Sequence, residues 1–188
     1  MLDITIGLNE LKFVSEIHIV AINNEVKELL WLINKDYNGV PVVKTINFNK
    51  SNTEEFKFNL DEEMVSELSE PKKYLYEPNA AIMKSGAFDL LSSKYNISKL
   101  DKHTHLYTSE RLIDFPGRRF LINEVIPYHK KEIKKFLKIK KANISIRNFP
   151  ESVSEIRKKH KISDGGDVFL FFTTLESKNK VIIACSKV

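Results

Sequence analysis

Residues 16–22 form the first strongly apolar run of the chain, and as a strand this run is apolar on both faces. Ile17, Ile19 and Ala21 lie on one face, and Val20 and Ile22 lie on the other. Strands of this kind lie inside parallel sheets that helices cover on both sides. The pattern therefore predicts an α/β sheet with this strand in its interior.

Helices are predicted on both sides of this strand in the sequence. The first has Ile4, Leu8, Leu11 and Val14 on one face, and the second has Val26, Leu29, Leu30 and Ile33, with Asn23 or Asn24 as its cap. A hairpin over residues 46–60 follows, because apolar and polar residues alternate on both sides of a polar turn at 49–53. No strand precedes the first helix, so we expect the chain to begin inside a larger sheet.

The second half of the chain predicts a separate small domain. An acidic stretch at 61–70 ends at Pro71, and a helix begins at Glu77-Pro78-Asn79 and continues to Leu91. The elements expected after it are strands at 106–112 and 118–127, a helix at 129–141, a strand at 143–149, a helix at 152–160, and strands at 168–175 and 181–187. From residue 118 onward the order is β-α-β-α-β-β, which predicts a small mixed sheet with helices packed on it.

Three regions follow from these patterns. Residues 1–70 are predicted to be the terminal part of a larger α/β sheet, residues 71–115 a connecting segment of helix and strand, and residues 116–188 a small α/β domain. Ser152 and Glu155 have the spacing of a capping box, which fixes the start of the last helix.

Composition indicates a folded intracellular protein. Of the 188 residues, 42% are hydrophobic and 10% aromatic, enough for a packed core. No apolar run approaches 18 residues and no secretory leader is visible, so neither a membrane span nor export is expected. The single cysteine, Cys185, excludes an internal disulfide and a cysteine zinc site, which favours the cytoplasm.

The net charge of +5 hides a strong separation of charge. Residues 1–70 carry 6 Lys and Arg against 13 Asp and Glu, whereas residues 130–161 carry 12 against 3. A basic region of this kind attracts polyanions such as RNA. The alternative is that the lysines, 25 of the 30 basic residues, only solvate the outer faces of helices.

The candidate RNA-binding residues are basic side chains of this second half. On the helix from His129, the stripe consists of Lys131, Lys134, Lys135 and Lys138. On the next helix it is extended by Arg157, Lys158, Lys159 and Lys161. Arg118, Arg119 and Arg147 lie near strand ends, where a guanidinium can bind phosphate with two hydrogen bonds. The alternative for these arginines is ion pairing with Glu110, Asp114 or Glu124.

Catalytic and metal-binding motifs are not recognisable in the sequence. His103 and His105 could share a strand face, but no third ligand has suitable spacing, so no metal is expected. The glycines of Asp164-Gly165-Gly166-Asp167 lead into a strand, so this segment is predicted to be a turn rather than a phosphate-binding loop. We therefore assign no catalytic residue.

Several segments together resemble the C-terminal half of bacterial class I S-adenosylmethionine-dependent methyltransferases that carry a THUMP-like domain. They are residues 1–4 (MLDI), residues 18–30 (HIVAINNEVKELL), residues 76–86 (YEPNAAIMKSG) and the β-α-β-α-β-β region from residue 118. Their order and spacing span nearly the whole chain.

The resemblance implies a Rossmann-like sheet, of which this chain holds the last strands, followed by a THUMP-like, ferredoxin-like domain that presents RNA. It also implies that the cofactor loop lies outside this sequence, so that S-adenosylmethionine serves the longer parent and does not bind this chain tightly. By the same resemblance, Asp3, Asn24 and Glu25 would lie at the edge of the cofactor pocket, where open α/β sheets bind ligands.

Two hypotheses remain open at the level of the sequence. In the first, the chain is part of an RNA methyltransferase acting on tRNA or rRNA, and it is inactive by itself. In the second, it is a self-contained binding module for nucleic acid or protein, whose incomplete sheet a second copy or a partner protein completes.

Overall fold

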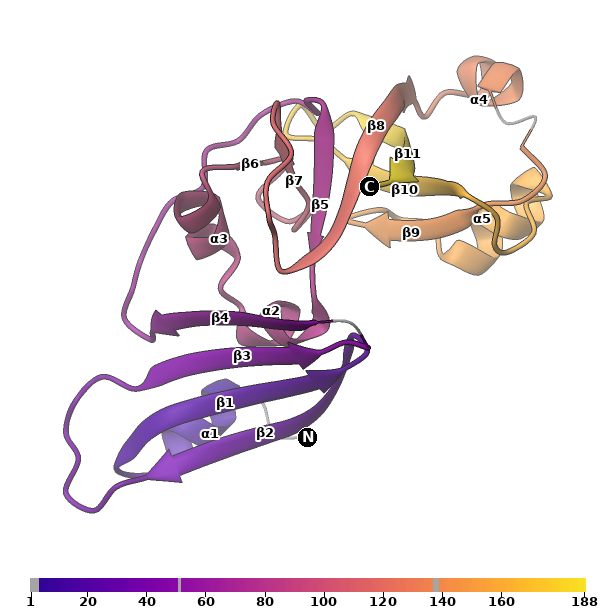
Figure 1. The fold of residues 1–188 in the computed structure, drawn as a ribbon. Helices are drawn as coiled ribbons and strands as arrows, with labels where there is room; N and C mark the ends of the chain where they lie inside the picture. Colours follow the sequence, from indigo (N-terminus) through magenta and orange to yellow (C-terminus); the bar gives the residue numbers. More distant parts are fainter. Residues whose placement is uncertain (1–3, 51, 137–138) are drawn as a thin grey trace. The chain divides into compact units, whose positions relative to one another are not determined.

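The computed structural model describes residues 4–50, 52–136 and 139–188, and these residues form two compact units (Figure 1). Unit 1 comprises residues 1–65 and 78–94, and unit 2 comprises residues 66–77 and 95–188. Each unit therefore contains two separate stretches of the sequence. The mixture of helices and sheets confirms the predicted α/β class, whereas the three predicted domain ranges stay a prediction.

Unit 1 is built on a four-stranded mixed sheet in the order β2-β1-β3-β4. Its strands are β1 (Val14–Ile22), β2 (Glu25–Ile33), β3 (Val42–Phe48) and β4 (Thr53–Asn59). β1 and β3 pair in parallel, and the other two pairs are antiparallel. The strand predicted at residues 16–22 and the hairpin of β3 and β4 are confirmed.

The helix predicted over residues 26–33 is wrong, because this segment is strand β2. Asn23 and Asn24 form a two-residue turn with φ of 49° and 63°, and β2 returns antiparallel to β1. Two positive φ angles are typical of the type I′ turn, whose twist matches that of the strands it joins. Asparagine tolerates this conformation better than most residues. Asn24 therefore lies in a hairpin turn, not at the start of a helix.

The helices of unit 1 are α1 (Ile4–Glu10), α2 (Ala80–Ser85) and most of α3 (Phe88–Tyr95). The first helix is shorter than predicted, since Val14 already belongs to β1. The helix predicted from Asn79 to Leu91 begins as expected, with the Asn79 side chain accepting a hydrogen bond from the Ile82 amide. It breaks at Gly86, whose φ of 75° closes α2 in the left-handed region.

One face of the four-stranded sheet is covered by helices. Ile17, Ile19 and Ala21 point to this inner face and are fully buried. Trp31 of β2 pairs with Ile17, and its ring lies so close to Gly7 of α1 that no side chain would fit there. Figure 1 shows α1 and α2 on the same side of the sheet. The expectation that helices cover both faces is therefore wrong for the described residues.

Unit 2 contains a seven-stranded sheet in the order β6-β7-β5-β8-β11-β10-β9. Its elements are β5 (Tyr74–Pro78), β6 (Ser98–Lys99), β7 (Tyr107–Ser109), β8 (Gly117–Pro127), α4 (Lys130–Phe136), β9 (Asn143–Arg147), α5 (Val153–His160), β10 (Val168–Thr174) and β11 (Lys180–Lys187). From β8 onward the predicted β-α-β-α-β-β order is confirmed, with β9 and β10 parallel and β10 and β11 antiparallel.

The core of unit 2 lies on both faces of this sheet. On one face, Ile133 of α4 and Ile156 of α5 pack with Leu170 and Phe172 of β10. On the other face, Phe171 joins a cluster that includes Phe120 of β8. On α5, Lys158 and Lys159 are exposed on the side away from this core. No helix within the described residues is both long and apolar enough to span a bilayer.

Candidate nucleic-acid interface

The start of β9 and the loop after α5 lie side by side at one end of unit 2. The Ser163 amide donates a hydrogen bond to the Lys140 carbonyl at 2.8 Å, and the Ala142 amide donates to the Ser163 carbonyl at 3.0 Å. Lys161 ends α5 in the left-handed conformation, with φ of 56°. These backbone contacts bring two basic segments, distant in sequence, next to each other.

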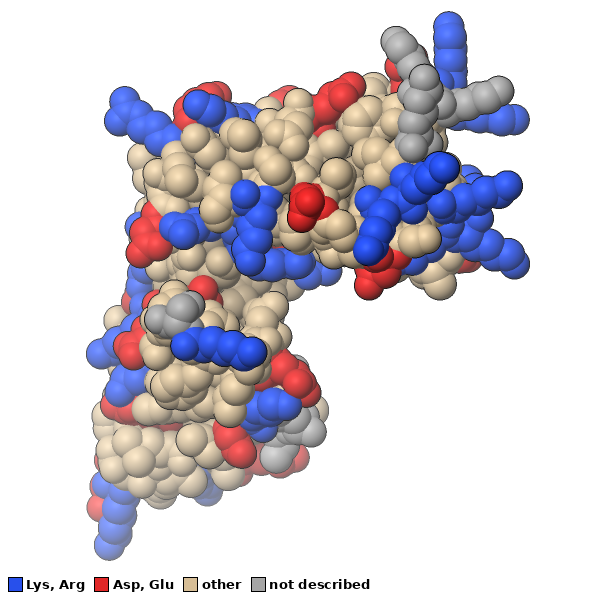
Figure 2. Space-filling view, turned by 45° about the vertical axis from the view of Figure 1, so that its right-hand side comes forward, with Lys and Arg blue, Asp and Glu red and all other residues tan. Residues whose placement is uncertain are grey.

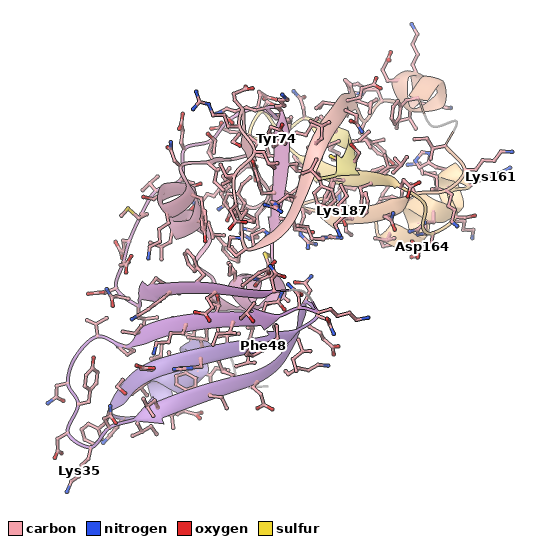
Figure 3. The ribbon with its side chains drawn as sticks, viewed as in Figure 1. Lys35, Phe48, Tyr74, Lys161, Asp164 and Lys187 are labelled. Atoms are coloured by element: carbon pink, nitrogen blue, oxygen red, sulfur yellow. The ribbon has the colours of Figure 1, made fainter. Side chains whose placement is uncertain are left out.

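Four exposed lysines from these segments form what we call the basic surface: Lys140, Lys141, Lys158 and Lys161. Figure 2 shows Lys and Arg side chains gathered at the end of unit 2 that carries α4 and α5, and Figure 3 labels Lys161. None of the four ammonium groups forms an ion pair with a described carboxylate. Their charges are therefore available to a polyanion.

Arg157 supports the basic surface from inside. Its guanidinium donates to the carbonyls of Ala142 and Ile162, both at 3.3 Å, and pairs with the carboxylate of Asp164. These contacts hold the loop after α5 against the start of β9. RNA binding by Arg157 stays a prediction, but its guanidinium N–H groups already donate hydrogen bonds within the protein. Figure 3 labels Asp164 on this loop.

The start of α5 is fixed by hydrogen bonds between Ser152 and Glu155. The Ser152 side chain accepts a hydrogen bond from the Glu155 amide, and the Glu155 carboxylate accepts from the Ser152 amide at 2.7 Å, which confirms the capping box. The carboxylate also accepts a hydrogen bond from the Ser152 hydroxyl at 2.7 Å, and the bonds from the Ser152 amide and hydroxyl hold the pKa of Glu155 below its usual value. The helix therefore presents Lys158 in a fixed position, one turn before Lys161.

Arg118 and Arg147 lie in an internal ion cluster. Both pair with Glu77, whose side chain is only 3% exposed. The Arg118 Nε donates to one carboxylate oxygen at 2.6 Å, and the Arg147 guanidinium lies 2.6 Å from the other. Arg118 also donates to the hydroxyl of Ser145 at 3.2 Å. The two arginines thus tie β5 to β8 and β9 within unit 2.

Arg119 forms the ion pair that the sequence offered as its alternative, with Asp114 at 3.2 Å. Asp114 is fully exposed, so this contact is weak. Lys131 is exposed on α4 and pairs with no described carboxylate. The side chains of Lys134 and Lys135, and Lys138 as a whole, lie outside the described residues. RNA binding by these residues stays a prediction.

A polar cluster joins the end of β8 to both ends of α5. The Tyr128 hydroxyl donates to Glu151 at 2.8 Å and lies 3.4 Å from the His160 ring, while Lys159 pairs with Glu151 at 2.9 Å. Burial and the charge of Lys159 lower the pKa of His160. Burial raises the pKa of Glu151, but the hydrogen bonds from Lys159 and Tyr128 outweigh it and lower this pKa overall. Sequence reasoning missed this cluster, because its members share no motif.

The residues that the resemblance placed at a cofactor pocket have structural roles here. The side-chain oxygen of Asn24 accepts from the Ala80 amide at 2.7 Å, at the start of α2, and the Asn24 amide donates to Asn47. Glu25 pairs with Lys27 at 2.8 Å. Asp3 lies outside the described residues. Asn24 and Glu25 thus have partners within unit 1, and the pocket-edge role of the three residues stays a prediction.

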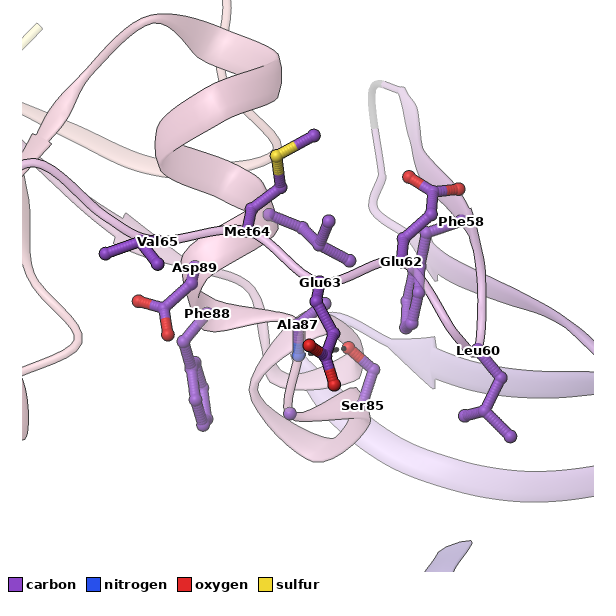
Figure 4. A pocket seen from close by; sticks show the side chains of 12 residues that line it. Phe58, Leu60, Glu62, Glu63, Met64, Val65, Ser85, Ala87, Phe88 and Asp89 are labelled. Carbon is purple, nitrogen blue, oxygen red and sulfur yellow. Dashed lines mark hydrogen bonds between the residues drawn. The ribbon is translucent and has the colours of Figure 1, made fainter.

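An open groove of about 670 Å³ lies on unit 1 between residues 58–65 and residues 85–90 (Figure 4). Its lining combines apolar side chains such as Phe58 and Leu60 with the carboxylates of Glu62 and Glu63. The Asn59 amide and Lys94 lower the pKa of Glu62. The Ser85 hydroxyl in this lining donates to the Ile82 carbonyl and accepts from the Ala87 amide. No group of three or more potential metal ligands occurs among the described residues.

Comparison with family models identifies the domains of the second half. Residues 74–116 match a model described as a ferredoxin-like domain, and residues 117–187 match one described as THUMP domain-like. The basic surface thus lies entirely within the THUMP-like region. The predicted THUMP-like domain is confirmed, and the chain carries a ferredoxin-like domain directly before it.

A solved structure from Porphyromonas gingivalis W83, that of a candidate methyltransferase, is similar to almost the whole chain. The identity is 34% and the TM-score 0.88 over 97% of this chain, which spans 48% of the P. gingivalis chain. No curated protein matches this chain. The likeness includes both units, and it extends over about half the length of the relative.

Proposed function

We propose that this chain is part of an S-adenosylmethionine-dependent RNA methyltransferase, in which its THUMP-like domain binds the RNA substrate. The observation that carries the proposal is the basic surface on this domain, formed by four exposed lysines without ion-pair partners among the described residues. The likeness to a candidate methyltransferase supports the reaction class. The RNA is a tRNA or an rRNA, and the location is the cytoplasm.

Lysine side chains bind RNA mainly through phosphates. An ammonium group is a compact point charge, and its contact with phosphate releases counterions from the nucleic acid. No Phe, Tyr or Trp side chain of unit 2 is among the exposed large hydrophobic residues of the described chain, and such side chains are the usual platforms on which bases stack. The surface is therefore suited to the backbone of RNA rather than to its bases.

The methyl donor belongs, in this proposal, to the longer parent protein. In this division of roles, the chain contributes substrate binding, and the transfer step takes place in the rest of the parent protein. Calorimetric titration of the chain with S-adenosylmethionine should show no binding at micromolar concentrations. Tight binding would contradict this division of roles.

Charge reversal on the basic surface tests RNA binding. In Lys158→Glu/Lys161→Glu, affinity for tRNA measured by fluorescence anisotropy should fall at least about 10-fold, because two phosphate contacts become repulsive. Lys178→Glu/Lys180→Glu is the matched control, because it changes the net charge by the same amount. These exposed lysines lie in the turn between β10 and β11 and at the start of β11, at the far end of β10 from the basic surface. Equal loss in both variants would show only a general effect of net charge and would contradict the proposed surface.

A further inference from the structure

On the second face of the four-stranded sheet in unit 1, exposed apolar side chains lie among charged ones such as Glu28, Glu55 and Lys57, and no described helix of unit 1 packs on it. Its apolar side chains alternate with the inner-face residues along three strands: Val20 and Ile22 of β1, Leu30 and Leu32 of β2, and Val42, Ile46 and Phe48 of β3. We call this set the outer face. Phe48 is labelled in Figure 3.

Four of these side chains are almost half exposed. The exposed fractions are 45% for Ile22, 49% for Leu30, 47% for Leu32 and 47% for Phe48. Single exposed apolar residues are common, but a contiguous set on one sheet face is typical of an interaction site. The outer face is therefore a candidate binding surface.

Charges at the centre of the outer face neutralise one another. The Oε2 atom of Glu16 lies 2.6 Å from Nε2 of His18 and 2.5 Å from Nζ of Lys44. Hydrogen bonds from Lys44 and His18 hold the pKa of Glu16 below its usual value. Because the carboxylate already has both partners, an apolar layer can cover this part of the sheet without leaving an unpaired charge.

Strand β2 forms one edge of the sheet, and its second half is apolar. The run Leu29–Ile33 consists of five apolar residues, whereas the charged residues Glu25, Lys27 and Glu28 lie at the other end of the strand. Proteins usually protect such an edge with charges, proline or a covering element. None of these protects residues 29–33 within the described part of unit 1. The edge is therefore able to pair with a further strand.

We propose that the outer face and the β2 edge bind a further segment of an α/β protein, with amphipathic helices covering the face and a strand pairing with β2. The parallel pair of β1 and β3 is of the kind found in sheets that helices cover on both faces, although the other two pairs of this sheet are antiparallel. Among the described residues of unit 1, only the inner face has helices. The P. gingivalis protein contains about as much sequence again beyond the matched half. The inference rests on the proposed function, since it names the surface that joins this chain to the rest of a methyltransferase.

Association with the unmatched half of the P. gingivalis protein tests this surface. The experiment is to co-express that half with the full chain described here and to measure co-purification. The matched half of the P. gingivalis protein, in place of this chain, is the positive control. The wild-type chain should co-purify with the unmatched half. Leu30→Lys/Leu32→Lys should weaken association at least about 10-fold, since charge at the centre of an apolar interface is costly.

Leu112→Lys is the matched control, because Leu112 is 48% exposed but lies in unit 2. It should leave association unchanged. Circular dichroism shows whether each variant is folded, and tRNA affinity should be the same for all three proteins, so loss of this interface is distinguishable from loss of RNA binding.

Two results would overturn the inference. One is absence of co-purification with wild type while the positive control associates. The other is a homodimer of this chain, measured by sedimentation, that Leu30→Lys/Leu32→Lys dissociates, because a second copy would then occupy the outer face.

Discussion

The carboxylate of Glu77 neutralises two guanidinium groups while being almost completely withdrawn from water. Removing one member of a buried ion cluster leaves the remaining charges without compensation. Arg118 and Arg147 themselves are half-buried, so water reaches them only in part. Glu77 therefore matters more for the stability of unit 2 than its position in a strand suggests.

We predict that Glu77→Ala lowers the free energy of unfolding by about 3 kcal/mol, measured by urea denaturation. Asp114→Ala is the matched control, because Asp114 is the exposed partner of the neighbouring Arg119. It should leave stability unchanged. If both substitutions have the same small effect, the ion cluster of Glu77 does not stabilise unit 2.

His160 makes stability depend on pH. Its pKa in the folded protein is below the ordinary 6.5, so the unfolded chain binds the proton more tightly. Stability is therefore complete above pH 6.5 and is lost as pH falls through the lower folded pKa. The lowered pKa of Glu151 adds a further loss in more acidic solution.

The melting temperature should accordingly decrease between pH 7 and pH 5, and His160→Gln should flatten this decrease. Glutamine retains polar atoms near Tyr128 but does not titrate. A variant with the same pH dependence as wild type would show that another group is responsible.

At the scale of the element, the turn between β1 and β2 also holds the start of α2. The Asn24 side chain accepts from the Ala80 amide, whereas the Asn23 side chain has no hydrogen bond within the described residues. Both asparagines have positive φ, which glycine adopts without strain. Glycine at either position thus keeps the turn and removes only the side chain.

Asn24→Gly should reduce stability by about 1 kcal/mol through loss of one hydrogen bond at a helix start, and Asn23→Gly should have little effect. Urea midpoints of the two variants give the comparison. A larger loss in Asn23→Gly would mean that turn geometry, rather than the bond to α2, determines stability here.

The sequence predicted most elements of the second half but misassigned β2. Val26, Leu29, Leu30 and Ile33 fit the spacing of a helix face, although they lie in a strand. The decisive signal was Asn-Asn between two apolar runs, which is typical of a hairpin. The capping box of α5 was predictable, because it depends on residues only three positions apart.

The ion partners of the arginines could not be predicted, because they are distant in sequence. Arg118 and Arg147 meet Glu77 only after β5, β8 and β9 have assembled in one sheet. The predicted interface was also placed on α4, whereas the lysines that the structure brings together are at 140–141 and 158–161. Of these, Lys158 and Lys161 were predicted to extend the basic stripe, whereas Lys140 and Lys141 were not.

At the scale of the whole molecule, acidic and basic residues are divided between the two halves of the chain. Residues 1–70 have a net charge of −7, and residues 130–161 have +9. The negative charge lies mainly at residues 61–70, which carry 5 acidic and no basic residues, whereas residues 14–59 carry 5 basic against 6 acidic residues. We therefore expect RNA to approach the THUMP-like domain rather than the first half of the chain. This division agrees with separate roles, one surface for RNA and another for a protein segment.

The dependence of RNA affinity on salt tests the central claim most directly. If four lysines contact phosphates, the slope of log K against log salt concentration should be about −3, and Lys158→Glu/Lys161→Glu should make it shallower by about 2. A wild-type slope near zero, or an unchanged slope in this variant, would contradict RNA binding by the basic surface.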